Sequence, residues 1–445
     1  MCYELVNSRS LHYTIIITRH NWPIEYLYDQ IQTKRDQMDT WNAAKWLSND
    51  LVLGQVGGIA VDKNDTVYIF HRGNHLWTSS SFGQADNVYT EQYNGAINES
   101  TIIMVDKNGR VMKKLGEHMF YLPHGITVDS DFNIWVTDVA LHQVMKFKPA
   151  SNDAVLVKGK RFVPGKDSNH FCKPTSVAVL QNGDFFVADG YCNSRIVKFD
   201  SNGKKILEWG RSTVRHHGMR IPGPGEFFIP HALALNSDES LLCVADRENG
   251  RVQCFHPSNG TYSSLLSKLP FPLRTVYSIA YSNFGGGSFV LVNGPRMFND
   301  LVQGFVVSPS GRWIGSFGSN KLNAPHDLAV SADGSAIYVA EITVSGPRAW
   351  KFVHSKYPIS LPLLEGGSER LGLLRLSAKE PTPGTVVLLL NLTHFSRMKK
   401  EDTPTMVNLT RNLTICSTLI WAGLKQSRIQ DFKLGRKNAQ NVNHF

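Results

Sequence analysis

The sequence lacks any run of about eighteen apolar residues, which is the length that a membrane-spanning helix requires. Its nearest candidates, residues 386–390 and 414–424, are both too short. The N-terminal region has little of the character of a secretion signal, since its only apolar run covers residues 13–17. We therefore expect no transmembrane segment, and no clear signal peptide is evident.

Signatures of nucleic-acid binding are also missing, although the net charge is +10. The sequence has no aromatic RNA-binding motif and no basic stripe at helical spacing. Residues after Val353 hold thirteen Lys or Arg against six Asp or Glu, so about +7 of the excess charge lies there. We expect no nucleic-acid partner.

The chain has ample material for a core and for turns, with 42% hydrophobic residues, 36 Gly and 20 Pro in 445 residues. A unit of about fifty residues recurs six times, and each copy has an apolar strand, a turn rich in Asp, Asn or Gly, and a second strand. Its copies are GGIAVDKNDTVYIFHRG, PHGITVDSDFNIWVTDV, PTSVAVLQNGDFFVADGY, PHALALNSDESLLCVADR, VYSIAYSNFGGGSFVLVNG and PHDLAVSADGSAIYVAEI.

Third and fourth strands follow most copies, such as QVMKFK and then AVLVKG. Four strands in each of six repeats predict an all-β, six-bladed β-propeller with NHL-like repeats. A β-sandwich is the alternative, but sandwiches do not repeat at this period. The sixth repeat stops after AWKFV, so we expect a strand within residues 46–55 to complete the last blade. The predicted organisation is an N-terminal segment (1–45), the propeller (46–353) and a tail without periodicity (354–445).

Three histidines share one position in alternate repeats. His124, His231 and His326 each follow a proline and precede the aligned apolar residue by two positions, in repeats two, four and six. Alternate blades of a six-fold ring lie about 120° apart, so the three imidazoles can converge on the axis. A single histidine here would be a structural residue, but three at one register predict a metal site of catalytic zinc type.

A second register, at the ends of the second strands, carries Arg72, Tyr191 and Arg247. Taken alone, each arginine fits a surface or salt-bridged position. Near a metal on a shared axis they become candidates to bind a substrate carboxylate, because the planar guanidinium can donate two hydrogen bonds. A phenol flanked by arginine and metal would have a lowered pKa and could act as a base.

Two of the six cysteines, Cys243 and Cys254, flank a turn, where adjacent antiparallel strands can bring them together. This placement favours an oxidising compartment. Glycosylation motifs at Asn64, Asn98 and Asn259 permit the same interpretation.

Eight strings in order along the chain resemble the peptidyl-α-hydroxyglycine α-amidating lyase portion of the peptide-amidating enzymes. They are FHRGNHLW, FYLPHGI, WVTDVALHQV, NHFCKPTSVAV, ADGYCNSRIVKF, PHALAL, CVADRENGRVQCF and PHDLAV. The resemblance runs from about residue 54 to residue 353. Two departures from the family pattern, Ala324 and Glu341, put local packing in question more than activity.

The resemblance implies a zinc-dependent enzyme that splits peptidyl-α-hydroxyglycine into a peptide amide and glyoxylate, the second step of C-terminal peptide amidation. It implies zinc on the three histidines and catalytic roles for Tyr191, Arg72 and Arg247, with Arg72 expected near the tyrosine and Arg247 near the substrate carboxylate. It also implies a structural calcium bound by Asp327 and the backbone carbonyls of Ile59 and Ile126. The implied disulfides are Cys172 to Cys192 and Cys243 to Cys254.

The implied partner is a separate copper-dependent monooxygenase that makes the hydroxyglycine, since the chain shows no motif of that enzyme. The implied location is secreted or in the lumen of the secretory pathway. Two other classes stay open: a non-catalytic propeller that binds peptides or proteins, and a calcium hydrolase of the lactonase type. The first needs no matched histidines, and the second would favour oxygen ligands.

Overall fold

The computed structural model describes residues 39–149, 151–213, 222–266, 274–283, 286–295 and 301–354, together with strands β1 (Cys2–Asn7), β2 (Ser10–Ile17) and β29 (Val386–Asn391). The chain divides into two units, one of Met1–Trp22 with Pro362–Phe445 and one of Pro23–Leu361. In the first unit, β2 pairs antiparallel with both β1 and β29 to form a three-stranded sheet. Apart from these strands and β3 below, the predicted N-terminal segment and tail lie almost entirely outside the described residues.

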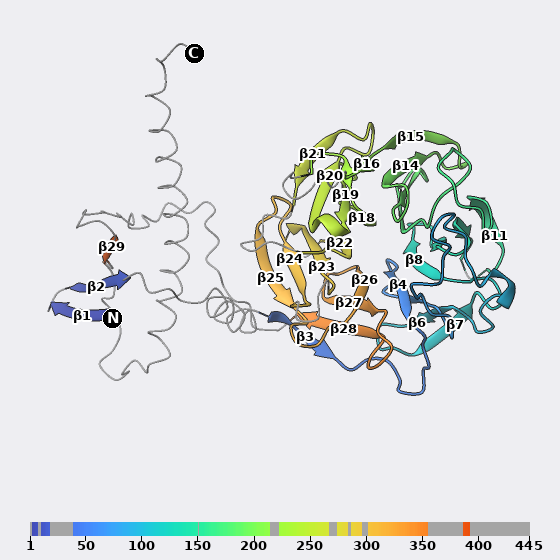
Figure 1. Cartoon of the computed structure of the whole chain (residues 1–445). Coiled ribbons are helices and arrows are strands. Elements are labelled where there is room, and N and C mark those ends of the chain that lie inside the picture. Colours follow the sequence, from blue (N-terminus) through green and yellow to red (C-terminus); the bar gives the residue numbers. More distant parts are fainter. Residues whose placement is uncertain are drawn as a thin grey trace, which may run out of the picture. The chain divides into compact units, whose positions relative to one another are not determined.

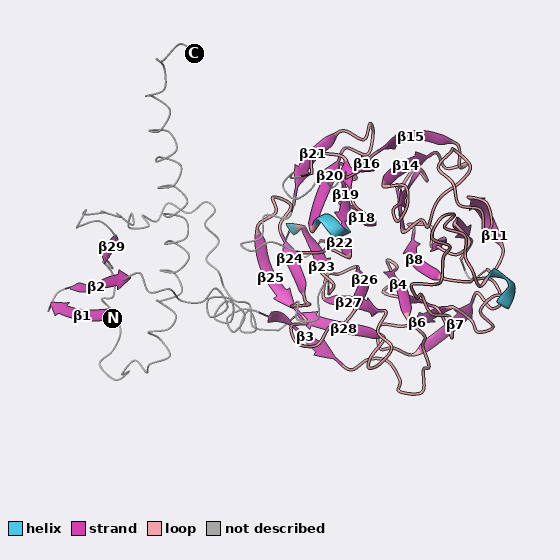
Figure 2. Ribbon diagram, viewed as in Figure 1, coloured by secondary structure: helices cyan, strands magenta, loops and turns pink. Residues whose placement is uncertain are grey.

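Six groups of four antiparallel strands follow one another around a ring in the second unit, which confirms the predicted propeller (Figures 1 and 2). The first three blades are β4 (Val56–Val61), β5 (Val67–His71), β6 (Ile102–Val105) and β7 (Val111–Leu115); β8 (Pro123–Val128), β9 (Ile134–Asp138), β10 (Gln143–Phe147) and β11 (Ala154–Lys158); and β12 (Ser176–Val179), β13 (Phe185–Asp189), β14 (Arg195–Phe199) and β15 (Lys205–Trp209).

The other three blades are β18 (Pro230–Leu235), β19 (Leu242–Asp246), β20 (Arg251–Phe255) and β21 (Tyr262–Leu265); β22 (Ser278–Ser282), β23 (Ser288–Val292), β24 (Gly304–Val307) and β25 (Trp313–Phe317); and β26 (Pro325–Val330), β27 (Ala336–Glu341), β28 (Ala349–His354) and β3 (Asp39–Ala44). A short parallel pair, β16 (Arg211–Ser212) and β17 (Glu226–Phe227), and two single 3₁₀ turns, η1 (Gln92–Asn94) and η2 (Arg247–Asn249), complete the described elements. No helix in the described part of the chain is long and apolar enough to cross a membrane.

The second strands of all six blades are buried along their whole length. Neighbouring blades pack face to face through these strands, as where the Trp135 and Phe185 rings lie 4.6 Å apart. The turn before the second strand is fixed locally in several blades. In blade one, the Asp62 carboxylate accepts hydrogen bonds from the amides of Asn64 and Thr66.

Blade six is completed by β3, which pairs antiparallel with β28 in the register Lys351 with Ala44. The closing strand therefore comes from the N-terminal side, as expected, but it lies at Asp39–Ala44 and the prediction of residues 46–55 was wrong. Residues 45–55 form no strand, and Trp46, the only aromatic residue of the predicted range, packs on Tyr338 with ring centroids 5.0 Å apart. Strand β3 also pairs in parallel with β25 of blade five.

The first strand of each blade faces the centre of the ring. Residues of all six of these strands, β4, β8, β12, β18, β22 and β26, line a channel of about 320 Å³. The residues at the starts of these strands, which include the three histidines, line one part of the channel.

Candidate active site

A bulge places each of the three histidines at the start of an inner strand. In blade four, Pro230 pairs with Asp246 and Ala232 with Ala245, so His231 is an extra residue without a cross-strand partner. The same register shift spans His326 and His124. A bulge bends the strand and turns the extra side chain away from its usual direction. The position that the three histidines share in the sequence therefore corresponds to a β-bulge at the start of each inner strand.

Each imidazole is held by a hydrogen bond from Nδ1 to a backbone carbonyl of the next blade. The acceptors are the residues at the same register in the three blades without histidine. The pairs are His124 with Thr175 at 2.8 Å, His231 with Tyr277 at 2.6 Å, and His326 with Gly57 at 2.6 Å. A carbonyl oxygen only accepts, so Nδ1 carries the proton and the lone pair is on Nε2.

The three rings meet on the axis. Their centroids are separated by 4.6 to 4.8 Å, and each ring offers one nitrogen within 4.8 Å of the others. All three side chains are buried. Burial lowers the pKa of His326 to about 3 and holds the pKa values of His124 and His231 well below the ordinary value, so the imidazoles are neutral. Three neutral nitrogen donors with converging lone pairs can hold a metal ion.

Tyr191 projects from the loop after β13 toward this cluster. Its hydroxyl lies 3.1 Å from His124 Nε2 and 3.3 Å from His231 Nε2. Burial raises the pKa of the phenol, and the positive charges of Arg247 and Arg72 oppose that rise only in part. With the two arginines alone the phenol pKa is thus raised, whereas the sequence predicted a lowered pKa beside arginine and metal.

Arg247 lies in η2, directly after β19. Its Nη1 donates to the Tyr191 hydroxyl at 3.3 Å, and its Nε and Nη2 both lie 2.9 Å from the Glu248 carboxylate. The guanidinium also lies 4.8 Å from the centroid of the Tyr277 ring. This placement differs from the expectation that Arg72 would be the arginine nearer to the tyrosine.

Arg72 follows β5 and is 1% exposed. Its Nε donates to the carbonyl of Pro123 at 2.9 Å and its Nη1 to Gln55 Oε1 at 3.0 Å. Its Nη2 is buried without a hydrogen-bond partner among the described residues. A buried guanidinium nitrogen without a partner is available to donate a hydrogen bond to an acceptor on a ligand.

The residues expected to bind calcium line the central channel, on the neighbouring inner strands β26, β4 and β8. The Asp327 carboxylate accepts hydrogen bonds from Ser278 Oγ at 2.7 Å and from the amide of Ile59 at 3.1 Å. Burial nevertheless raises the pKa of Asp327 to about 7. The donors present do not fully compensate the buried charge, so the carboxylate fits a site for a cation.

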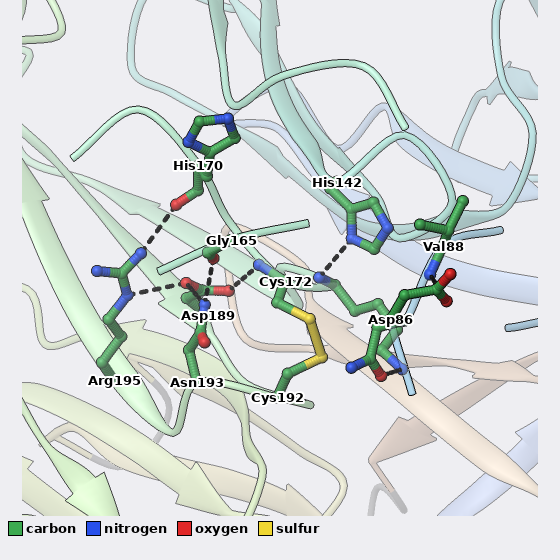
Figure 3. Close-up of a disulfide and its surroundings, with 12 residues drawn as sticks. Asp86, Val88, His142, Gly165, His170, Cys172, Asp189, Cys192, Asn193 and Arg195 are labelled. Carbon is green, nitrogen blue, oxygen red and sulfur yellow. Dashed lines mark hydrogen bonds and ion pairs between the residues drawn. A yellow bond between two sulfur atoms is a disulfide. The ribbon is translucent and has the colours of Figure 1, made fainter. Parts of the chain in front are cut away.

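Both expected disulfides are present. Cys172 and Cys192 join the segment before β12 to the loop that carries Tyr191, with a Cα separation of 5.5 Å (Figure 3). Asp189 fixes the same loop, since its carboxylate accepts hydrogen bonds from the amide of Cys172 and from Asn193 Nδ2 (Figure 3). The second disulfide joins Cys243 and Cys254, which are directly paired in β19 and β20.

Acidic residues at the ends of the second strands hold the loops that lead into the histidine strands. Asp138 accepts from the amide of Leu122, just before Pro123, and Asp246 accepts from the amide of Phe228. Glu341 plays the same part in blade six, where its Oε1 accepts from the amides of Asn323 and Ala324. The two departures from the family pattern, Glu341 and Ala324, are therefore joined by a hydrogen bond. The glutamate side chain holds the loop before β26 as the aspartates do in blades two and four.

Two residues at the site did not emerge from the sequence. The ring of Trp77 lies 4.8 Å from that of Tyr191, and the Arg72 guanidinium lies 5.5 Å from the Trp77 ring centroid. Gln55 contacts Arg72. Neither occupies a repeated register, because Trp77 lies in the insertion of residues 74–100 and Gln55 precedes the first repeat. The string FHRGNHLW, which ends on Trp77, was the one available signal.

Comparisons with known proteins identify a repeat family and several relatives. The NHL repeat model matches residues 171–199 and 229–255, in blades three and four. Peptidyl-alpha-hydroxyglycine alpha-amidating lyase 1 of Drosophila melanogaster is 46% identical over 332 residues, which cover 71% of this chain and 60% of that protein. Lyase 2 of the same organism is 42% identical over 321 residues, 69% of this chain and 74% of that protein.

Peptidyl-glycine alpha-amidating monooxygenase B of Xenopus laevis is 43% identical over 339 residues, 73% of this chain but only 38% of that protein. The chain thus spans well under half of the monooxygenase and about three quarters of lyase 2. Identity at this level over most of a relative's length, together with the propeller and its histidine cluster, shows that the chain belongs to the peptidyl-α-hydroxyglycine α-amidating lyase family.

Proposed function

We propose that the chain is a zinc-dependent lyase that converts peptidyl-α-hydroxyglycine into a peptide amide and glyoxylate. The observation that carries this proposal is the convergence of three buried, neutral imidazoles beside a tyrosine and two arginines. A non-catalytic propeller would have no use for this set of side chains. A calcium hydrolase would present oxygen ligands in place of three nitrogens.

The donor set fits a zinc ion. Each Nδ1 donates its proton to a backbone carbonyl, so each Nε2 is unprotonated and its lone pair is available to a metal ion. Backbone carbonyls that accept the Nδ1 proton and so fix the tautomer are typical partners of histidines that bind metals. Zinc in such a site would act as a Lewis acid that acidifies the substrate hydroxyl.

The reaction needs a base, because the substrate hydroxyl must lose its proton as the bond between Cα and the amide nitrogen breaks. Tyr191 Oη lies beside two of the three Nε2 atoms, and Tyr191 in its deprotonated form would accept that proton. As the carbon–oxygen double bond of glyoxylate forms, the electron pair of the breaking bond goes to the amide nitrogen. Tyr191 can return its proton to that nitrogen, so the reaction needs no other reactant.

The two arginines take different parts in this proposal. Arg247 donates to the Tyr191 hydroxyl and is suited to stabilise the tyrosinate. Arg72 keeps a buried, unpartnered Nη2 and is suited to bind the substrate carboxylate. This division is the reverse of the one expected from the sequence.

Calcium at Asp327, with the carbonyls of Ile59 and Ile126, would have a structural role in the channel, because the three residues tie together the inner strands of blades six, one and two. Removal of calcium should lower the melting temperature of the wild-type protein, whereas Asp327→Asn should show no such response. An equal response in both proteins would argue against this site.

The proposal places the chain after a hydroxylating monooxygenase, which would supply the hydroxyglycine substrate. Two disulfides and the exposed glycosylation motifs at Asn64, Asn98 and Asn259 support a location in the secretory lumen or outside the cell. The test is to incubate the purified chain with a peptidyl-α-hydroxyglycine and to measure peptide amide and glyoxylate. Equal amounts of both products are expected, and a failure to form either would refute the function.

A further inference from the structure

The guanidinium of Arg72 is held on two of its three nitrogens. Nε donates to the carbonyl of Pro123, the residue directly before the metal-site residue His124, and Nη1 donates to Gln55 Oε1. Only Nη2 has no partner in the described part of the chain. The orientation of this free nitrogen is therefore decided by the acceptors on Nε and Nη1.

Gln55 is itself fixed by contacts to two blades. Its Nε2 donates to the carbonyl of Ile342 at 2.9 Å, which lies directly after β27 of blade six. Its Oε1 accepts from Arg72 Nη1 and from the amide of Trp77 at 3.4 Å. Because the Ile342 carbonyl only accepts, the amide of Gln55 can take one orientation, with its oxygen toward the arginine.

The backbone around Gln55 is built for this contact. The amide of Arg72 donates to the carbonyl of Gln55 at 2.8 Å, so main chain and side chain of Gln55 both bind the arginine. A Cβ atom on the preceding residue, Gly54, would lie 1.9 Å from the carbonyl oxygen of Gly73. Glycine is therefore needed to bring the segment before β4 against the segment after β5.

We propose that Gln55 is a positioning residue, which orients Arg72 so that its free Nη2 meets the carboxylate of the substrate. This inference rests on the proposed function and extends it to the recognition of the substrate's anionic end. Gln55 also couples that recognition to closure of the ring, since it reaches from blade one to the carbonyl of blade six.

The test compares two substrates that differ only at the terminal carboxylate, a peptidyl-α-hydroxyglycine and its methyl ester, which lacks the negative charge. Gln55→Met keeps the volume of the side chain and removes the acceptor for Arg72. We expect Gln55→Met to raise KM for the acid about tenfold, since a hydrogen bond to a charged group is of that strength, with kcat changed by less than about twofold. KM for the ester should stay at its wild-type value.

A double-mutant cycle separates positioning from general damage. In an Arg72→Ala background, Gln55→Met should have no further effect on KM for the acid, because the group it orients is gone. Gln143→Met is the matched control, since Gln143 is a partly buried glutamine that donates to the carbonyl of Gly159, away from Arg72. It should leave KM for both substrates unchanged.

Gln55→Glu gives a second, independent variant. The carboxylate still accepts from Arg72 but adds a negative charge beside it and loses the donor to the Ile342 carbonyl, so KM for the acid should rise more than in Gln55→Met. Zinc content and melting temperature identify any variant that fails to fold.

Equal losses on acid and ester, or the same loss in the Arg72→Ala background, would overturn the role of Gln55. An active wild-type enzyme with unchanged KM in both Gln55 variants would overturn it as well. A wild-type protein that forms no amide from either substrate would instead refute the proposed function, so the two failures can be told apart.

Discussion

Arg247 Nη1 donates a hydrogen bond to the hydroxyl of Tyr191 across 3.3 Å. The two arginines of the site thus have different partners, since Arg72 donates to the Pro123 carbonyl and to Gln55. The Tyr191 hydroxyl therefore contacts both the histidine cluster and Arg247.

Substitution of a metal-site histidine should remove both metal and activity. His231→Ala leaves two imidazoles, so the zinc content should fall from one per chain to near zero and kcat/KM should fall by about a hundredfold or more. His118→Ala is the control, because the His118 side chain is 64% exposed. Metal analysis and amide release measure the two effects, and a His231→Ala protein with full zinc would contradict the site.

Removal of the Tyr191 hydroxyl oxygen should abolish the function of the base without loss of the metal. Tyr191→Phe should lower kcat by about a hundredfold or more, which is the usual contribution of a positioned base, while zinc stays bound. Tyr93→Phe changes a tyrosine that is 91% exposed and should have no effect. A Tyr191→Phe enzyme with normal turnover would require another base.

The two disulfides should have different effects on activity. Cys172→Ala with Cys192→Ala frees the loop that carries Tyr191 and should lower kcat by about tenfold with zinc retained, because small displacements of a catalytic group are costly. Cys243→Ala with Cys254→Ala removes a bond between paired strands away from that loop and should lower the melting temperature with kcat within about twofold. Similar kcat losses in both proteins would show that Cys172–Cys192 has no special part in placing Tyr191.

His142 should make the fold sensitive to acid. Burial lowers its pKa from the ordinary 6.5 to about 4, so protonation favours the unfolded chain. Its contribution to the free energy of unfolding is complete above pH 6.5 and is lost as pH falls toward 4, by an amount on the order of 3 kcal/mol.

His142→Asn is the variant that isolates this effect. Asparagine tolerates the left-handed backbone at this position, where φ is 56°, and its oxygen can accept from the amide of Lys173 as His142 does. Denaturant unfolding of both proteins from pH 8 to pH 4 should show a difference that narrows as pH falls. Parallel curves would contradict the assignment.

Much of the architecture could be predicted from the sequence because equivalent positions can be aligned from one repeat to the next. His124, His231 and His326 were found by alignment alone, because each follows a proline at the same position of its repeat. The closing strand was misplaced because its partners, such as Lys351 for Ala44, are distant in sequence and lie in another copy of the repeat. No local pattern in residues 39–44 marks it.

The roles of the arginines could not be read from register. Arg72 and Arg247 occupy equivalent positions, yet Glu248 binds one guanidinium and Gln55 binds the other. These neighbours are specific to each blade, and they decide which nitrogen remains free. Side-chain direction at equivalent positions is therefore the part of the site that only the structure supplies.

The most direct test of the account is to measure zinc and product on the same preparation of the purified chain. With one zinc per chain, a peptidyl-α-hydroxyglycine should yield peptide amide and glyoxylate in equal amounts, and a chelator should abolish the reaction until zinc is restored. A folded protein that binds zinc at the three histidines but releases no glyoxylate, or one that releases it at full rate without metal, would contradict the account.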